Sequence, residues 1–177
     1  DEESMLVKRN TENLEAFNEY TQGRYFWRKR TAESIQKSIE HFKHAIELDS
    51  TYALAYSGLA DAWAVLPGYS NVAMAEVELK QAEAANTAVR LDDNLAEAHT
   101  SMAWAYWISL RDVENAEIEF KRAMELNPCY PWAHIWYGNM IDAWWHDREG
   151  KKREIEKALE CDPLSVVALN NLASMNS

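Results

Sequence analysis

Apolar residues recur along this chain at spacings of three and four, in stretches separated by short polar breaks. This spacing places the apolar side chains on one face of a helix. The clearest pair of helices is predicted over about residues 95–109 and 113–126. Its buried face is predicted to contain Ala98, Met102, Ala103, Tyr106, Ala116, Phe120 and Ala123. The pattern therefore predicts an all-α protein built from helix pairs.

One phrase marks the end of each pair. It is written Ala45-Ile-Glu-Leu-Asp-Ser50, Ala88-Val-Arg-Leu-Asp-Asp93, Ala123-Met-Glu-Leu-Asn-Pro128 and Ala158-Leu-Glu-Cys-Asp-Pro163, with leading alanines 43, 35 and 35 residues apart. A second series, Ala55, Ala98, Ala133 and Ala168, has the same spacings. A period shared by two motifs predicts a stack of small units that bury their apolar faces against one another.

Small residues near the middle of each first helix let the partner helix approach closely: Gly23, Ala60, Ala103 and Gly138. The motifs Tyr56-x2-Leu59-Ala60-x2-Trp63 and Ala116-x3-Phe120-x2-Ala123-x4-Pro128 resemble the tetratricopeptide repeat. That resemblance implies a right-handed α-solenoid of antiparallel helix pairs. We expect a linker over 1–10 and a single superhelical domain over 11–177, with repeats at about 16–52, 53–95, 96–130 and 131–165 and a terminal helix at 166–177.

A narrower resemblance concerns four segments: Lys8-Arg-Asn-Thr-Glu-Asn-Leu-Glu-Ala-Phe17, Gly23-Arg-Tyr-Phe-Trp-Arg-Lys-Arg-Thr31, Leu95-Ala-Glu-Ala-His-Thr-Ser-Met-Ala103 and Leu159-Glu-Cys-Asp-Pro-Leu-Ser165. They are similar to the C-terminal repeat regions of bacterial multidomain signalling proteins, in which the repeats follow a winged-helix, nucleotide cyclase or Ser/Thr kinase domain. The resemblance implies a sensing or partner-binding part, and none of those activities carries over. Because the chain starts without methionine and ends inside a helical pattern, we expect an excerpt of a longer protein.

The repeat is irregular in two informative places. The second unit is 43 residues long, so its second helix, predicted over about 72–91, is expected to project beyond its neighbours. Lys151 stands where the fourth unit would ordinarily carry alanine, which predicts looser packing there. Thr31 and Asp147 precede predicted helices and are candidate N-caps.

Composition and charge exclude several classes. A net charge of −11 repels phosphate backbones, so we expect no nucleic-acid binding by this segment. No apolar run is long enough for a membrane span, and we expect a soluble, cytoplasmic segment without membrane contact. No disulfide is expected between Cys129 and Cys161, because successive repeats are displaced by roughly 10 Å, beyond bridging reach.

Motifs that carry chemistry are missing from the sequence. Glu40-His41-x-x-His44 lacks the order that presents two imidazoles around a general base, and no third ligand is evident. There is no phosphate-binding glycine loop, nucleophile elbow or catalytic triad pattern. We therefore expect no enzyme, metal or cofactor. His99 and His134, at equivalent repeat positions, are expected to cover the interface within each helix pair.

The concave surface, lined by the first helix of each pair, is the predicted binding site. Tryptophan is enriched at binding hot spots, and this chain has eight. The predicted groove for a peptide or neighbouring domain comprises Tyr20, Arg24, Trp27, Arg28, Asp61, Thr100, Trp104, Trp107, Trp132, Ile135, Asn139, Asp142 and Asn170. Asn139 and Asn170 would bond the peptide backbone, and Arg24 and Arg28 would clamp a carboxylate or phosphate.

Other interpretations stay open. The tryptophans could instead pack between superhelical turns, and the arginines could be solvated charges paired with nearby acids. A second functional hypothesis is an oligomerisation or intramolecular regulatory arm, which would form a homodimer through the projecting helix or an exposed end helix. A weaker one is a small-ligand sensor.

Overall fold

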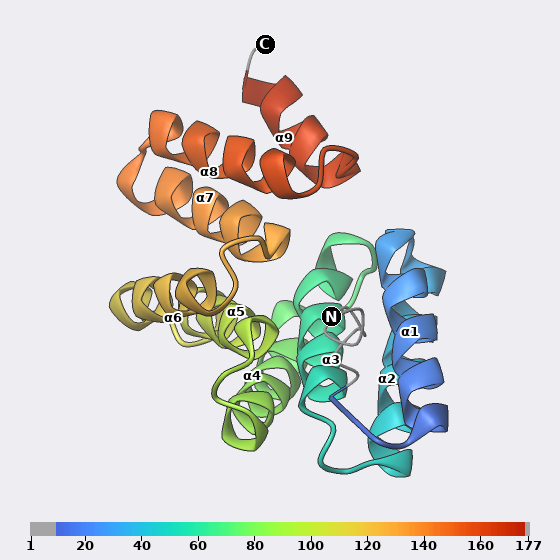
Figure 1. Ribbon diagram of the computed structural model, residues 1–177. Coiled ribbons are helices and arrows are strands. Elements are labelled where there is room, and N and C mark those ends of the chain that lie inside the picture. The colour runs from blue at the N-terminus through green and yellow to red at the C-terminus, as the bar shows by residue number, and fades with distance from the viewer. Residues whose placement is uncertain (1–9, 176–177) are drawn as a thin grey trace. The chain divides into compact units, whose positions relative to one another are not determined.

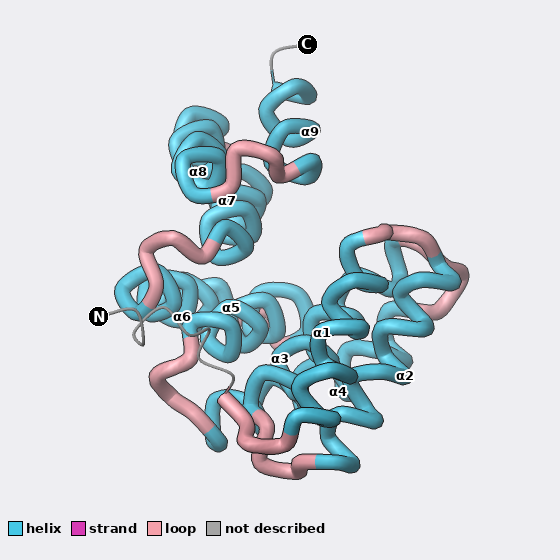
Figure 2. The backbone as a smooth tube through the Cα atoms, turned by 45° about the vertical axis from the view of Figure 1, so that its right-hand side comes forward, coloured by secondary structure: helices cyan, strands magenta, loops and turns pink. Residues whose placement is uncertain are grey.

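The computed structural model describes residues 10–175, and every element of regular structure in that range is helical (Figures 1 and 2). The expected linker over 1–10 therefore lies almost wholly outside the described residues. The chain divides into two compact units, Asp1–Asp92 and Asp93–Ser177. None of the helices in residues 10–175 has the length and apolar character needed to cross a membrane.

The first unit contains two helix pairs. Helix α1 (Leu14–Arg28) packs on α2 (Ala32–Leu48), and α3 (Ala53–Val65) packs on α4 (Met74–Leu91), as Figure 1 shows. A short 3-10 turn, η2 (Leu66–Gly68), follows α3, and α2 also packs on α3. With 18 residues, α4 is longer than its 13-residue partner α3 and similar in length to the 17-residue α2, and its projection beyond its neighbours stays a prediction.

The second unit continues the same scheme. Helix α5 (Ala96–Trp104) runs into a π-helical turn, η3 (Ala105–Ser109), and pairs with α6 (Val113–Leu126). Helix α7 (Pro131–Trp145) pairs with α8 (Arg148–Cys161), which also contacts α9 (Val166–Met175). Two complete pairs and a further helix thus form this unit, in agreement with the repeat pattern.

Local chemistry explains where the helices begin. Asn13 caps α1 by accepting from the backbone N–H groups of Glu15 and Ala16. Thr31 and Ser34 form a capping box at the start of α2. The Asp147 carboxylate accepts from the Gly150 N–H at 2.7 Å at the start of α8. The two predicted caps are therefore confirmed.

Close approach of paired helices is visible around Phe42 of α2. Its ring is fully buried between Gly23 of α1 and Gly58 of α3, and a Cβ atom on either glycine would come within 2.5 Å of the ring. The same role predicted for Ala103 in α5 is consistent with its complete burial. Of the residues predicted for the buried face of the third repeat, five are buried and two are half-buried: Ala98, Ala103, Ala116, Phe120 and Ala123 are buried, and Met102 and Tyr106 are half-buried.

The predicted loosening at Lys151 is wrong. A Cβ atom on Gly138 of α7 would lie 3.3 Å from the Lys151 carbonyl oxygen, so α8 approaches α7 closely. The Lys151 side chain folds back, and its Nζ reaches the Asp142 carboxylate at 3.2 Å. A long side chain is accommodated because its charged end leaves the interface for an acid at the edge.

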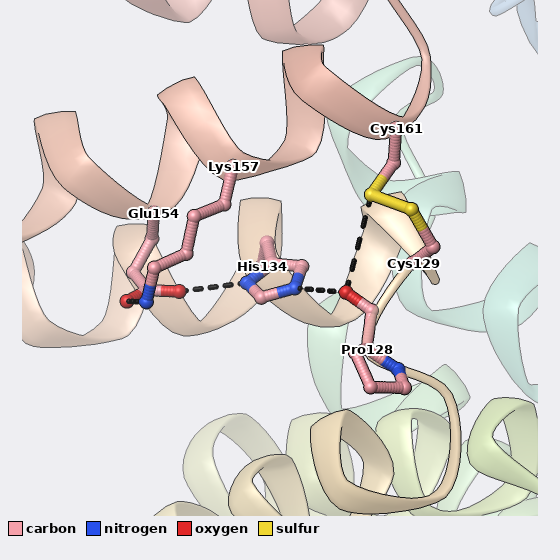
Figure 3. A network of polar contacts seen from close by, with 6 residues as sticks. All are labelled: Pro128, Cys129, His134, Glu154, Lys157 and Cys161. Carbon is pink, nitrogen blue, oxygen red and sulfur yellow. Dashed lines mark hydrogen bonds and ion pairs between the residues drawn. A yellow bond between two sulfur atoms is a disulfide. The ribbon is translucent and has the colours of Figure 1, made fainter.

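The expectation of two separate thiols is also wrong. Cys129 and Cys161 form a disulfide, with Cα atoms 5.3 Å apart (Figure 3). Cys129 lies just before α7, and Cys161 is the last residue of α8. The start of α7 lies beside the end of its antiparallel partner α8, so these two cysteines face each other at one end of a single helix pair. The displacement between successive repeats does not apply to them.

Candidate functional site

Four indoles of the second unit form one group, which we call the indole cluster: Trp104, Trp107, Trp132 and Trp136. The ring centroids of Trp104 and Trp107 are 5.2 Å apart, those of Trp104 and Trp136 4.6 Å, and those of Trp132 and Trp136 6.0 Å. Trp136 is buried, and the other three are half-buried. Trp104 and Trp107 therefore contact each other directly, and Trp132 joins them through Trp136, which is not among the predicted groove residues.

The π-helical turn η3 places part of this cluster. The N–H of Leu110 donates to the Ala105 carbonyl at 2.9 Å, which spans five residues instead of the four of an α-helix. Trp107 lies in this turn, and its ring meets that of Trp104 edge-on, with an angle of 80° between the ring planes. Single π-turns of this kind are frequent at functional sites. Of the four indoles of the cluster, Trp107 is therefore the one that lies in the π-turn.

Two other predicted groove residues of this unit are interior. Ile135 is fully buried, and Thr100 is buried with its hydroxyl donating to the Ala96 carbonyl at 2.8 Å. Their predicted exposure on a groove is wrong, because both side chains are buried. Asn139 is half-buried, Asn170 is exposed on α9, and the Asp142 carboxylate pairs with Lys151.

The first unit does not present Trp27 to solvent. Its ring is fully buried, and its indole N–H donates to the Asp61 carbonyl oxygen at 3.2 Å. The Asp61 carboxylate is also buried and receives Arg24 at 2.9 Å. The expectation that Trp27 and Asp61 line an open groove is therefore wrong, because α1 and α3 enclose them. Tyr20 is half-buried, with its ring centroid 5.4 Å from that of Tyr52.

The arginines near Trp27 are placed differently from the predicted clamp of Arg24 and Arg28. Arg24 is held by Asp61, and Arg28 is exposed at the end of α1. Arg30 lies instead over the Trp27 ring, 3.8 Å from its centroid. Burial lowers the pKa of Arg30 to about 10, with nearby Tyr69 and Asp61 opposing the shift. Helical spacing could not identify Arg30, because it follows the helix in a left-handed conformation with φ 54°.

Two buried histidines repeat the same contacts 35 residues apart. His134 Nδ1 lies 2.7 Å from a Glu154 carboxylate oxygen, and its Nε2 lies 2.9 Å from the Pro128 carbonyl oxygen (Figure 3). His99 meets Glu119 at 2.5 Å and the Asp93 carbonyl at 2.8 Å. Each imidazole joins the first helix of its pair to the second, which confirms the predicted interface role.

Both ring nitrogens of His99 face an acceptor, and this arrangement favours its doubly protonated imidazolium form. Burial opposes that charge on His99, but the hydrogen bonds to Glu119 and Asp93 outweigh it and raise the pKa of His99. His41 also meets a carboxylate, that of Glu19, at 2.7 Å. Among residues 10–175, no three His, Cys, Asp or Glu side chains are grouped to hold a metal ion.

Residues 96–128 match the tetratricopeptide repeat family. The chain has the tetratricopeptide-repeat fold. TTC0263, a thermophilic repeat protein of Thermus thermophilus, is similar with a TM-score of 0.70 and 17% identity over 93% of this chain and 83% of that one. MamA gives a TM-score of 0.52 and 19% identity over 83% of this chain and 80% of that one.

IFIT1, as a monomeric mutant, is similar with a TM-score of 0.60 and 15% identity, over 90% of this chain and 37% of that one. A search of curated protein sequences finds no match. These structural likenesses concern the fold. The specificity of this tetratricopeptide-repeat chain has to be argued from its own side chains.

Proposed function

We propose that this chain is a protein-interaction scaffold that binds a peptide or a neighbouring domain through the indole cluster, without chemistry. The main support is that Trp104, Trp107 and Trp132 are half-buried. Each of these rings contacts another ring of the group or the buried Trp136. Indoles that are already held in place lose little conformational entropy when a ligand covers them. Trp is also the side chain most enriched at binding hot spots.

The surroundings support a rigid surface. Thr100 of α5 and Ile135 of α7 are buried, so the helices that carry most of the indoles are fixed by packing. Asn139, half-buried on α7, offers an amide that can bond a peptide backbone. Preorganised aromatic surfaces with a few polar groups are typical of ligand-binding sites.

The test is a peptide library displayed on phage and selected on the whole chain. Selected peptides are then measured by calorimetry against Trp107→Ala and against Tyr25→Ala, which removes an exposed aromatic ring of the first unit, outside the cluster. We expect at least about tenfold weaker binding to Trp107→Ala and little change with Tyr25→Ala, as truncation of a hot-spot residue implies. Equal affinity for Trp107→Ala and the parent chain would show that the indole cluster is not the binding surface.

Self-association is the second candidate, and α9 favours it. Leu164 and Val166 are 85% and 68% exposed at the start of this helix, and Leu169 is 46% exposed. Grouped exposed apolar side chains of this kind mark interaction surfaces. Sedimentation equilibrium of the parent chain and of Leu169→Glu tests it: a dimer that dissociates in the variant supports self-association, and a parent chain that stays monomeric excludes it.

The setting of the scaffold is part of the same proposal. The resemblance to bacterial signalling proteins implies that the repeats serve a larger signalling protein. A cytoplasmic location stays a prediction, and the disulfide bears on it, because disulfides persist mainly in oxidising compartments. Detecting the free or bridged state of Cys129 and Cys161 by thiol labelling in cells would test the location.

A further inference from the structure

A pocket of about 450 Å³ opens where α6, α7 and the start of α8 meet. Its lining combines aromatic and acidic groups: Glu117, Tyr137, Ile141, Trp145, Asp147, Gly150, Arg153 and Glu154. This volume lies in the range of small-ligand sites. The pocket uses none of the four rings of the indole cluster.

Trp145 connects this pocket to a second one. It ends α7, where His146 takes a left-handed conformation and turns the chain towards α8. The second pocket, of about 430 Å³, is lined by Arg111, Asp112, Val113, Glu114, Trp144 and Trp145. Trp144 and Trp145 are 57% and 46% exposed. We call these two residues the tryptophan ridge. Adjacent exposed indoles beside two pockets are a feature of interaction surfaces.

The charge of the pocket linings favours a positively charged ligand. The two linings together carry five carboxylates, Asp112, Glu114, Glu117, Asp147 and Glu154, against two guanidinium groups, Arg111 and Arg153. The same field acts on Tyr137, whose hydroxyl donates to Glu117 at 3.1 Å. Burial, followed by the carboxylates of Glu117, Glu154 and Asp147, raises the pKa of Tyr137.

Two of these carboxylates already form ion pairs with basic side chains of the same chain. Lys121 Nζ lies 2.8 Å from Glu117, and an Arg153 nitrogen lies 3.6 Å from Asp147. Both basic side chains are mostly exposed, at 58% and 64%, so these are weak surface ion pairs. An incoming guanidinium that pairs with Glu117 and also stacks on Trp145 would gain a cation–π contact in addition to the ion pair.

We propose that the tryptophan ridge and its two pockets bind a basic peptide segment of a partner protein, with an arginine or lysine side chain seated beside Trp145 and the carboxylate of Glu117. The ridge provides the apolar contact, and the pocket carboxylates provide the charge complementarity. The site is independent of the indole cluster, since Trp145 follows Trp136 by nine residues, about 14 Å along α7.

The experiment titrates the whole chain with a short acetylated and amidated peptide in which glycine and arginine alternate. A matched peptide carries citrulline, which keeps the shape of arginine and lacks its charge. Calorimetry measures affinity, and the indole N–H signals of Trp144 and Trp145, assigned by substitution, report the location. We expect shifts of these two signals with the arginine peptide, and at least fivefold weaker binding of the citrulline peptide.

Two variants and two control variants test the residues. Trp145→Ala and Glu117→Gln should each weaken the arginine peptide three- to tenfold. Glu125→Gln is the matched control, because it removes the same charge from an exposed position on the same helix. Circular dichroism checks that each variant is folded, and Glu117→Gln keeps an oxygen for Tyr137. Trp107→Ala should leave this affinity unchanged, which separates the site from the indole cluster.

Several results would overturn the proposal. Equal weakening by Glu117→Gln and Glu125→Gln would mean that only the overall negative charge attracts the peptide. Unchanged affinity in a folded Trp145→Ala variant would remove the ridge from the interaction. No binding of the arginine peptide at millimolar concentration, or shifts confined to Trp104 and Trp107, would equally rule out this surface.

Discussion

At the scale of single residues, space around Phe42 is the tightest constraint of the first unit. The ring lies between two glycines on different helices, so it fixes both the α1–α2 and the α2–α3 approach. The sequence predicts the small residue at Gly23, because the repeat pattern demands one there. It does not predict that Gly58 meets the same ring, since contacts between neighbouring pairs have no spacing rule of their own.

Gly23→Ala should destabilise the protein by about 1–3 kcal/mol, because its methyl group would overlap the Phe42 ring and force a shift in a packed core. Urea unfolding followed by circular dichroism measures the loss. Gly68→Ala is the control, since a Cβ atom there meets nothing within 4 Å. Equal midpoints for Gly23→Ala and the parent chain would contradict the tight packing.

His99 should make stability depend on pH. Although burial opposes its charge, its hydrogen bonds to Glu119 and Asp93 raise its pKa in the folded state above the unfolded value of 6.5. The stabilisation is therefore complete below pH 6.5 and is lost as the pH rises through the folded-state pKa. Unfolding free energies of the parent chain and His99→Gln, measured from about pH 6 to 9, should differ most at the acid end.

Glu119 provides the control for that prediction. In Glu119→Gln the carboxylate acceptor is gone, so replacing His99 in this background should change the pH dependence little, as expected for two members of one interaction. A difference between parent and His99→Gln that stays constant with pH would show that the imidazole does not change its protonation in this range.

At the scale of helices, the sequence predicts where a helix begins better than it predicts which helices lie beside one another. Thr31 and Asp147 cap helices because their side chains reach backbone N–H groups only two or three residues away. The disulfide and the buried Trp27 were missed because they depend on which helix end or carbonyl lies alongside. The interior position of Trp27, for example, requires the Asp61 backbone of α3.

The disulfide should contribute about 3–4 kcal/mol to the stability of the second unit, because it closes a loop of 32 residues in the unfolded chain. Adding a reductant should therefore lower the urea midpoint. The Cys129→Ser and Cys161→Ser double variant should have the same urea midpoint as the reduced protein, and the reductant should not change that midpoint. An unchanged midpoint after verified reduction would mean that the bond adds nothing to native stability.

At the scale of the molecule, the repeat lattice predicts the architecture and says little about binding. The spacing of 35 residues places His99 and His134 in equivalent environments, and the structure confirms both. Trp144 and Trp145 have no counterpart in that lattice, because they stand where α7 ends and the repeat pattern stops specifying the fold. Departures of this kind are not predicted by a periodic pattern and become visible only when the helix ends are placed.

The division into two compact units predicts that the fragment 93–177 folds alone in its oxidised form. Repeat arrays are stabilised mainly by neighbouring repeats, and this unit holds two pairs, a further helix and a disulfide that compensates for its small core. Circular dichroism and the dispersed indole N–H signals of Trp104 and Trp136 should report the native fold, and reductant should unfold the fragment at markedly lower urea. The fragment 1–92 has no cysteine and should be insensitive to reductant. A fragment 93–177 that stays unfolded when oxidised would show that its helices need the first unit to fold.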